Sequence, residues 1–138
     1  LGKQIAVLLA NPGNAAAHNN RGASYNAKGD YDAAIRDFDR AIELLPNFAL
    51  AYHNRGFAYG ARNDYAPALR DFTRAVELKP DYAEAYGSRG AVYFYLDAYE
   101  KAWADVRTCR RLGGTPHPDI VQALTLPAVT VPLRQKRE

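Results

Sequence analysis

The sequence repeats itself every 34 residues, and this period limits the fold more than any other feature. The motif Arg-Gly-x-x-Tyr starts at Arg21, Arg55 and Arg89, and a second tyrosine follows six residues after the first in each copy. Columns of alanine, of aspartate and of a bulky apolar residue keep the same spacing further along. Because a single copy buries little apolar surface by itself, we expect neighbouring copies to stack on one another.

The second half of each repeat carries the apolar pattern of a helix. From Tyr31 to Ile42, apolar residues recur at intervals of three or four, which is the period of one helix face and not the alternation of a strand. In the preceding turn, Gly29 can adopt a positive φ and Asp30 can cap the helix, and an asparagine and Asp64 stand there in the second repeat. We therefore predict an all-α chain of antiparallel helix pairs.

A glycine recurs inside the first helix of every repeat, at Gly22, Gly56 and Gly90. Glycine within a helix costs about 1 kcal/mol relative to alanine, so its recurrence needs a compensating contact. We expect a side chain of the neighbouring helix to pack directly against the bare backbone at each of these positions.

With these columns the chain resembles the tetratricopeptide repeat family, whose 34-residue signature places Gly and Tyr in the first helix and Ala, an aromatic residue, Ala and Pro in the second. The resemblance covers three repeats at residues 15–48, 49–82 and 83–116. It implies a right-handed helical solenoid of antiparallel helix pairs, an α-α superhelix. In such a solenoid the first helix of each repeat lines a concave groove, and extended peptides are the usual partners.

The remaining segments of the single domain at residues 1–138 are assigned from the same columns. Residues 1–14 match the second helix of an earlier repeat, residues 117–127 predict a capping helix, and residues 128–138 predict an extended basic tail. Arg110 and Arg111 put charge where a further repeat would need an apolar surface. Stacking should therefore stop after the third repeat.

The recurring arginines admit two interpretations, a ladder for an anionic ligand or a set of structural ion pairs. Each arginine precedes an aspartate by 16 residues, and the midpoint of each pair falls in the turn between the two helices. Residues equidistant from a hairpin turn lie level on antiparallel helices, and a partly buried arginine is seldom left unpaired. We therefore expect an ion pair within each repeat: Arg21 with Asp37, Arg55 with Asp71, and Arg89 with Asp105.

Residues typical of catalysis or metal binding are few. Cys109 is the only cysteine, and it replaces an alanine of a buried column, so we expect it to act as a small apolar side chain. The three histidines, His18, His53 and His117, occupy unrelated repeat positions. No phosphate-binding loop or nucleophile–base arrangement accompanies them. We expect no catalytic residue, no metal and no cofactor.

The resemblance also indicates which residues would face the groove. They are Asn19, Asn20 and Asn26 of the first repeat, His53, Asn54 and Phe57 of the second, and Ser88, Phe94 and Tyr95 of the third. Asn20 and Asn54 resemble the asparagine ladder of some long family members, in which side-chain amides pair with a peptide main chain. The aromatic residues are explained equally by ligand contact and by packing on the next repeat.

One groove chemistry known in the family is missing from this chain. The two-carboxylate clamp of chaperone-binding members needs lysines and an arginine. The corresponding positions here hold Ala16, Asn19, Ala23, Asn54, Glu84 and Ser88. The resemblance therefore implies a weakly charged peptide as the ligand.

Composition and charge narrow the class of partner. Apolar residues make up 48% of the chain and mean hydropathy is −0.41, and no apolar run is long enough for a membrane span. The net charge of +3 comes from the C-terminal part, because residues 107–138 carry six basic against two acidic side chains. We therefore expect neither nucleic acid nor a membrane as the partner. A single cysteine is compatible with a reducing compartment such as the cytoplasm.

Two function hypotheses follow. The first is a non-catalytic protein–protein interaction scaffold that holds an extended peptide in the groove. The second is a self-assembling structural protein, a homo-oligomer whose protomers meet through the apolar N-terminal helix at residues 1–10 and the extended tail at residues 126–133.

Overall fold

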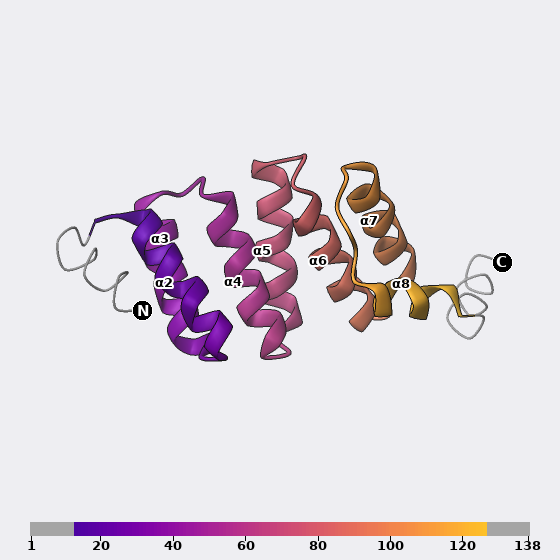
Figure 1. Ribbon diagram of the computed structural model, residues 1–138, viewed down its shortest axis with the longest axis horizontal. Helices are drawn as coiled ribbons and strands as arrows, with labels where there is room; N and C mark the ends of the chain where they lie inside the picture. Colours follow the sequence, from indigo (N-terminus) through magenta and orange to yellow (C-terminus); the bar gives the residue numbers. More distant parts are fainter. Residues whose placement is uncertain (1–12, 127–138) are drawn as a thin grey trace. The chain divides into compact units, whose positions relative to one another are not determined.

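The computed structural model describes residues 13–126, which form seven α-helices joined by short connections, with no strand among them (Figure 1). The helices are α2 (Ala15–Lys28), α3 (Tyr31–Leu44), α4 (Ala49–Ala61), α5 (Tyr65–Leu78), α6 (Ala83–Tyr95), α7 (Tyr99–Arg111) and α8 (Pro118–Thr125). The all-α prediction is confirmed. Residues 1–12 and 127–138, which carry most of the two segments invoked for self-assembly, lie outside the described residues, so that hypothesis stays a prediction.

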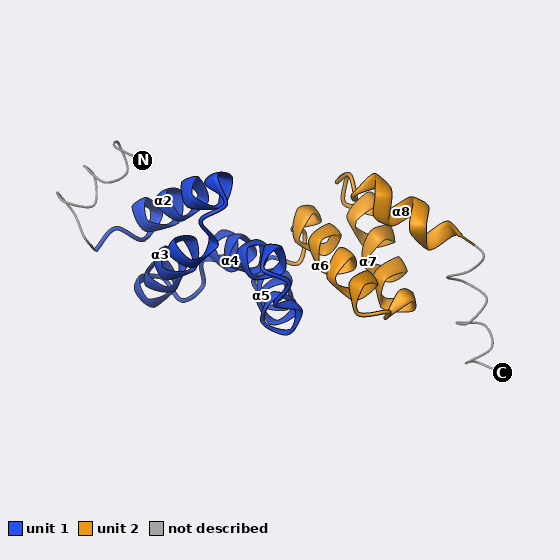
Figure 2. Cartoon of the chain, turned by 90° about the horizontal axis from the view of Figure 1, so that it is seen from below, with its two compact units in different colours: residues 1–79 blue, residues 80–138 orange. Residues whose placement is uncertain are grey.

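The chain divides into two compact units, which are coloured separately in Figure 2. In the N-terminal unit, residues 1–79, α2 packs against α3 and α4 against α5, while α4 also contacts α2 and α3. In the C-terminal unit, residues 80–138, α6 and α7 pack together and α8 contacts both. Each of the first three helix pairs falls within one 34-residue repeat.

Local capping marks the turn between α2 and α3. The main-chain N–H of Ala33 donates to Asp30 Oδ1 at 3.3 Å at the start of α3, and Gly29 closes α2 with a φ of 81°. Asp64 precedes α5 but makes no such bond, so that prediction is wrong. Its carboxylate instead contacts Arg62 Nη2 at 2.9 Å, whereas the equivalent position of the first repeat holds a lysine, Lys28.

An aromatic ring packs on the glycine of the first helix in two of the repeats. A Cβ atom at position 22 would lie 2.5 Å from Phe38 Cε1, and one at position 56 would lie 2.9 Å from Phe72 Cε1. At Gly90 the nearest atom is the Cβ of Asp105, at 3.2 Å. The expected contact against bare backbone is thus confirmed, and it lets the paired helices approach closely.

The hydrophobic cores lie between the helices of each unit. In the N-terminal unit, Phe38 is fully buried with Ala34, Ile35 and Ala58, and the repeat tyrosines pack around the edge of this cluster. In the C-terminal unit the cluster consists of Ala102, Val106, Ile120 and Leu124, with Trp103 packed against it. Ile120 and Leu124 come from α8, so this helix covers the end of the last repeat.

The glycine contact predicts opposite effects for two alanine substitutions. Gly22→Ala should lower the free energy of unfolding by about 1–3 kcal/mol, because the Phe38 ring leaves no room for the new methyl group. Gly60→Ala should raise it by about 0.5–1 kcal/mol, because the nearest atom to its Cβ would be Ala68 Cβ at 3.9 Å and alanine favours the helix. Urea denaturation followed by circular dichroism measures both. Equal shifts for the two variants would contradict the packing described.

Candidate functional site

Each repeat contains an arginine bound through two nitrogens to an aspartate on the paired helix. Nε and Nη2 of Arg21 donate to Asp37 at 2.7 and 2.6 Å, those of Arg55 to Asp71 at 2.9 and 2.8 Å, and those of Arg89 to Asp105 at 2.8 and 2.8 Å. The three aspartates are only 4–5% exposed. Because the protein's own carboxylates occupy these guanidinium groups, the arginines do not form a ladder for an anionic ligand.

Arg55 has a second carboxylate partner, which sequence reasoning missed. Its Nη1 donates to Asp39 Oδ1 at 2.8 Å, so one guanidinium group joins α3 to α4 and α5. Burial acts to lower the pKa of Arg55, but its hydrogen bonds with Asp71 and Asp39 raise that pKa overall. The signal was present in the sequence, because Asp39 precedes Arg55 by 16 residues and Asp71 follows it by 16.

The outward faces of α2 and α4 in the N-terminal unit carry no charge. We define the α2–α4 face as the residues Ala16, Asn20, Ala23, Leu50, Asn54 and Phe57. Spacings of three and four residues place each helix's members on one side of that helix. Leu50 is 44% exposed and Phe57 is 51% exposed, while the two alanines on α2 are exposed as well. The face is therefore apolar, with asparagine amides between its apolar side chains.

Two of the asparagines assigned to the groove connect helices instead. Asn19 is 3% exposed, and its Oδ1 accepts a hydrogen bond from Asn54 Nδ2 at 3.1 Å. Asn26 is half-buried and its Nδ2 donates to the main-chain oxygen of Asn54 at 3.1 Å. The assignment of Asn19 to a ligand surface is wrong, because it points from α2 toward α4 and offers no surface to a ligand.

Asn20 and Asn54 keep polar atoms that a ligand can use. Asn20 is exposed, and its side-chain amide makes no hydrogen bond to the part of the chain that the structure describes. Asn54 is half-buried, and its Nδ2 donates a hydrogen bond to Asn19. Its Oδ1 can still accept a hydrogen bond from a ligand. One amide thus offers a donor and an acceptor, and the other offers at least an acceptor.

The remaining residues assigned to the groove are divided between core and surface. His53 is half-buried, with its ring 5.4 Å from that of Phe72. In the C-terminal unit Phe94 packs against the core cluster, with ring centroids 5.7 and 5.8 Å from Tyr95 and Tyr99. Ser88 is half-buried and Tyr95 is 56% exposed. Of the aromatic residues, Phe57 and Tyr95 therefore expose the surface that a ligand needs.

Within residues 13–126, no group of three or more His, Cys, Asp or Glu side chains is arranged to hold a metal ion. No helix in the same range is long and apolar enough to cross a membrane. Cys109 is 1% exposed, and burial raises the pKa of its thiol, which leaves it protonated at neutral pH.

Comparison with known proteins gives a consistent result. The family model described as tetratricopeptide repeat matches residues 15–48 and 49–82. The first such domain of Spaghetti (RPAP3), bound to the HSP90 peptide SRMEEVD, is 28% identical over 87% of this chain and 93% of that chain, with a TM-score of 0.77. The second domain of the same protein, with the same peptide, is 31% identical over 71% and 91%, with a TM-score of 0.70.

A third similar structure is that of MamA. It is 26% identical to this chain over 80% of this chain and 64% of that chain, with a TM-score of 0.74. No curated protein sequence matches the chain significantly.

The two aspartates that bind Arg55 should contribute unequally to the free energy of unfolding. Asp71→Ala should lower the free energy of unfolding by about 3–5 kcal/mol, because it removes the buried carboxylate of the pair and leaves the half-buried guanidinium group of Arg55 without its two-point partner. Asp39→Ala removes a partner whose side chain is 46% exposed, and should cost less than about 1 kcal/mol. Thermal and urea unfolding measure the stability of each variant. Similar losses of stability in the two variants would show that burial does not determine how much each ion pair contributes.

Proposed function

The chain belongs to the tetratricopeptide repeat family, and from this we propose that it is a non-catalytic interaction scaffold that binds an extended, weakly charged peptide segment of a partner protein on its α2–α4 face. The observation that carries the proposal is the pair of exposed apolar side chains, Leu50 and Phe57, on a face without a charged residue. The family's similar structures from Spaghetti (RPAP3) hold a peptide.

The apolar part of the face suits a short stretch of peptide. Leu50 and Phe57 are seven residues apart on α4, which corresponds to about 10.5 Å along the helix axis. Exposed large apolar side chains gathered on one face are typical of interaction sites. Ala16 and Ala23 on the neighbouring helix are small, so a peptide backbone can approach α2 closely while its apolar side chains contact α4.

The polar part of the face suits a peptide main chain. Every non-proline residue of an extended peptide presents one N–H donor and one carbonyl acceptor. The Asn20 amide can satisfy both, and Asn54 Oδ1 can accept from a further N–H. Amide groups pair with any peptide sequence, so these contacts would fix the path of the ligand while the apolar side chains select it.

The absence of charge on the face sets the proposed ligand apart from the peptide in the similar structures. The peptide SRMEEVD carries three acidic side chains. No residue of the α2–α4 face is basic, and the nearby arginines Arg21 and Arg55 are already bound to aspartates. The carboxylates of an acidic peptide would lose their hydration on this face without finding a positively charged side chain to pair with. We therefore expect a ligand with few charges.

Phe57→Ala should weaken peptide binding about 10- to 100-fold, because it removes the largest apolar contact on the face. The ligand for this measurement is a peptide selected from a random library displayed on phage, with the intact chain as bait. Isothermal titration calorimetry then gives its affinity for each variant. Leu45→Ala is the matched control, because Leu45 is 42% exposed but lies in the connection between α3 and α4.

Asn20→Ala should also weaken binding, without changing stability, because its amide has no role inside the described fold. Asn54→Ala is less informative, since it takes the hydrogen-bond donor from buried Asn19 and costs stability as well. A selected peptide that binds Phe57→Ala and Asn20→Ala as well as the original chain would place the site elsewhere and overturn the proposal.

The peptide SRMEEVD should bind more weakly than its neutral counterpart SRMQQVN, in which glutamine and asparagine replace the acidic residues. Binding of the library-selected peptide should change little between low and physiological salt, because no ion pair contributes to it. Tight, salt-sensitive binding of SRMEEVD to the α2–α4 face would show instead that the chain recognises acidic peptides there, as the similar structures do.

A further inference from the structure

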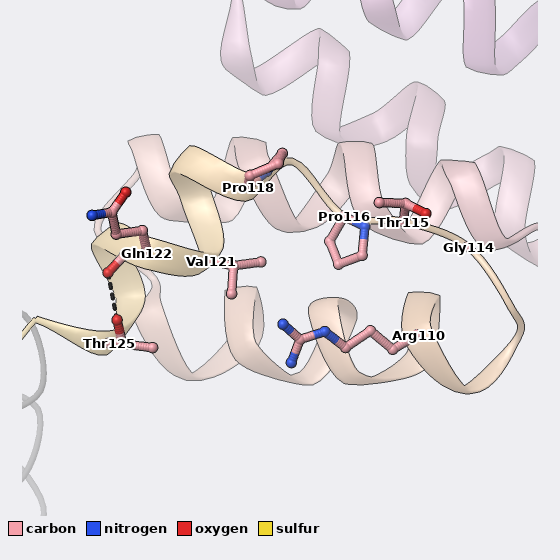
Figure 3. Close-up of a pocket in the computed structure, with 8 residues that line it drawn as sticks. All are labelled: Arg110, Gly114, Thr115, Pro116, Pro118, Val121, Gln122 and Thr125. Carbon is pink, nitrogen blue, oxygen red and sulfur yellow. Dashed lines mark hydrogen bonds between the residues drawn. The ribbon is translucent and has the colours of Figure 1, made fainter.

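A second candidate site lies in the C-terminal unit, in an open cleft of about 470 Å³ between α7 and α8 (Figure 3). It is lined by Arg110, Gly114, Thr115, Pro116, Pro118, Val121, Gln122 and Thr125. The two prolines and Val121 make most of its walls apolar. Its volume is within the range of pockets that take small ligands or a few residues of a peptide.

Arg110 gives this cleft a single charge. Figure 3 shows its side chain extended along α7, with the guanidinium group directed toward Val121 of α8. The guanidinium group makes no ion pair or hydrogen bond with the part of the chain that the structure describes, and no carboxylate lines the cleft. Arg110 differs in this respect from Arg21, Arg55 and Arg89, each of which binds an aspartate.

The favourable position of a cation near a helix C-terminus does not account for this arrangement. Arg110 and Arg111 both stand in the last turn of α7, where the helix dipole favours a positive charge. Only Arg110 lines the cleft. Its charged end lies back along the helix, away from the C-terminal end of α7.

Tight packing holds the wall opposite Arg110 in place. A Cβ atom at Gly114 would lie 2.8 Å from Ala83 Cβ and 2.9 Å from Cys109 Sγ, so the backbone rests directly on α6 and α7. Pro116 is buried, and Pro118 is the first residue of α8. Because this segment is already ordered, a ligand would not have to order it on binding.

We propose that the α7–α8 cleft binds an acidic peptide segment of a partner protein, in which an aliphatic or proline side chain fills the apolar walls and a neighbouring carboxylate pairs with Arg110. Charge complementarity selects this occupant, since a guanidinium group binds a carboxylate through two parallel hydrogen bonds. The chain's own C-terminal tail is a poor match, because Arg134, Lys136 and Arg137 outnumber its one acidic side chain, Glu138.

Two panels of short acetylated and amidated peptides test the proposal on the intact chain. In the first panel one central Glu is flanked by Val, Leu, Ile or Pro, and in the second Gln replaces the Glu. Binding is followed by calorimetry and by the fluorescence of Trp103, the only tryptophan, which lies on α7 seven residues before Arg110. At least one Glu peptide should bind at least about tenfold more tightly than its Gln counterpart.

Two substitutions that remove the same charge from α7 separate a built site from general attraction. Arg110→Gln should abolish the preference for Glu over Gln. Arg107→Gln should preserve it, because Arg107 is exposed one turn earlier and does not line the cleft. Equal effects of the two substitutions, equal binding of both panels, or no binding up to about 1 mM would each overturn the proposal.

Binding in the α7–α8 cleft can be tested separately from binding on the α2–α4 face. Binding in the α7–α8 cleft should weaken as salt rises and should be unchanged by Phe57→Ala, whereas binding on the α2–α4 face should show the opposite pattern. A chain whose binding at both places responds to Phe57→Ala has one site, and that result would also overturn the proposal.

Discussion

The buried pairing of one arginine with one aspartate in each repeat is the interaction on which the rest of the structure depends. An aspartate that is only 4–5% exposed is stable as an anion only with a cation beside it, so the two helices of a pair must stay level for the guanidinium group to meet both carboxylate oxygens. The same pairing neutralises the arginines of the N-terminal unit. The residues of the α2–α4 face are uncharged, and because the neighbouring arginines are paired with aspartates, they bring no free positive charge to it.

Most of the fold could be predicted from the sequence because the repeat shows each contact more than once. Sixteen residues separate Arg21 from Asp37, and the same separation recurs in the next two repeats, so the level pairing of helices was readable without coordinates. The glycine column likewise indicated a close contact at Gly22, where the structure places the ring of Phe38. A buried charge and a glycine inside a helix each lower stability unless a neighbouring group compensates. In both cases the residue therefore indicated that a partner must lie beside it.

The surface was less predictable, because neighbouring residues of a helix point about 100° apart and the sequence does not fix that rotation. Asn19 and Asn20 are chemically identical, yet Asn19 is buried against Asn54 and Asn20 is exposed. The difference depends on how α4 lies beside α2. The α7–α8 cleft was missed for a related reason: Arg110 was interpreted as a stop to further stacking, and its orientation becomes apparent only once α8 is in place.

The contact between Phe38 and Gly22 also restricts how such a sequence can change over time. A larger residue at position 22 lowers stability while the ring at position 38 is present, whereas loss of the ring leaves a void that a methyl group at position 22 can fill. The third repeat has a valine at the equivalent of Phe38, yet it retains Gly90, where an added methyl group would lie 3.2 Å from the Cβ of Asp105 and 3.3 Å from the main-chain oxygen of Ala102. The glycine of the first helix therefore stays restricted by the paired helix even where the aromatic ring has been lost, which makes it the harder of the two positions to change.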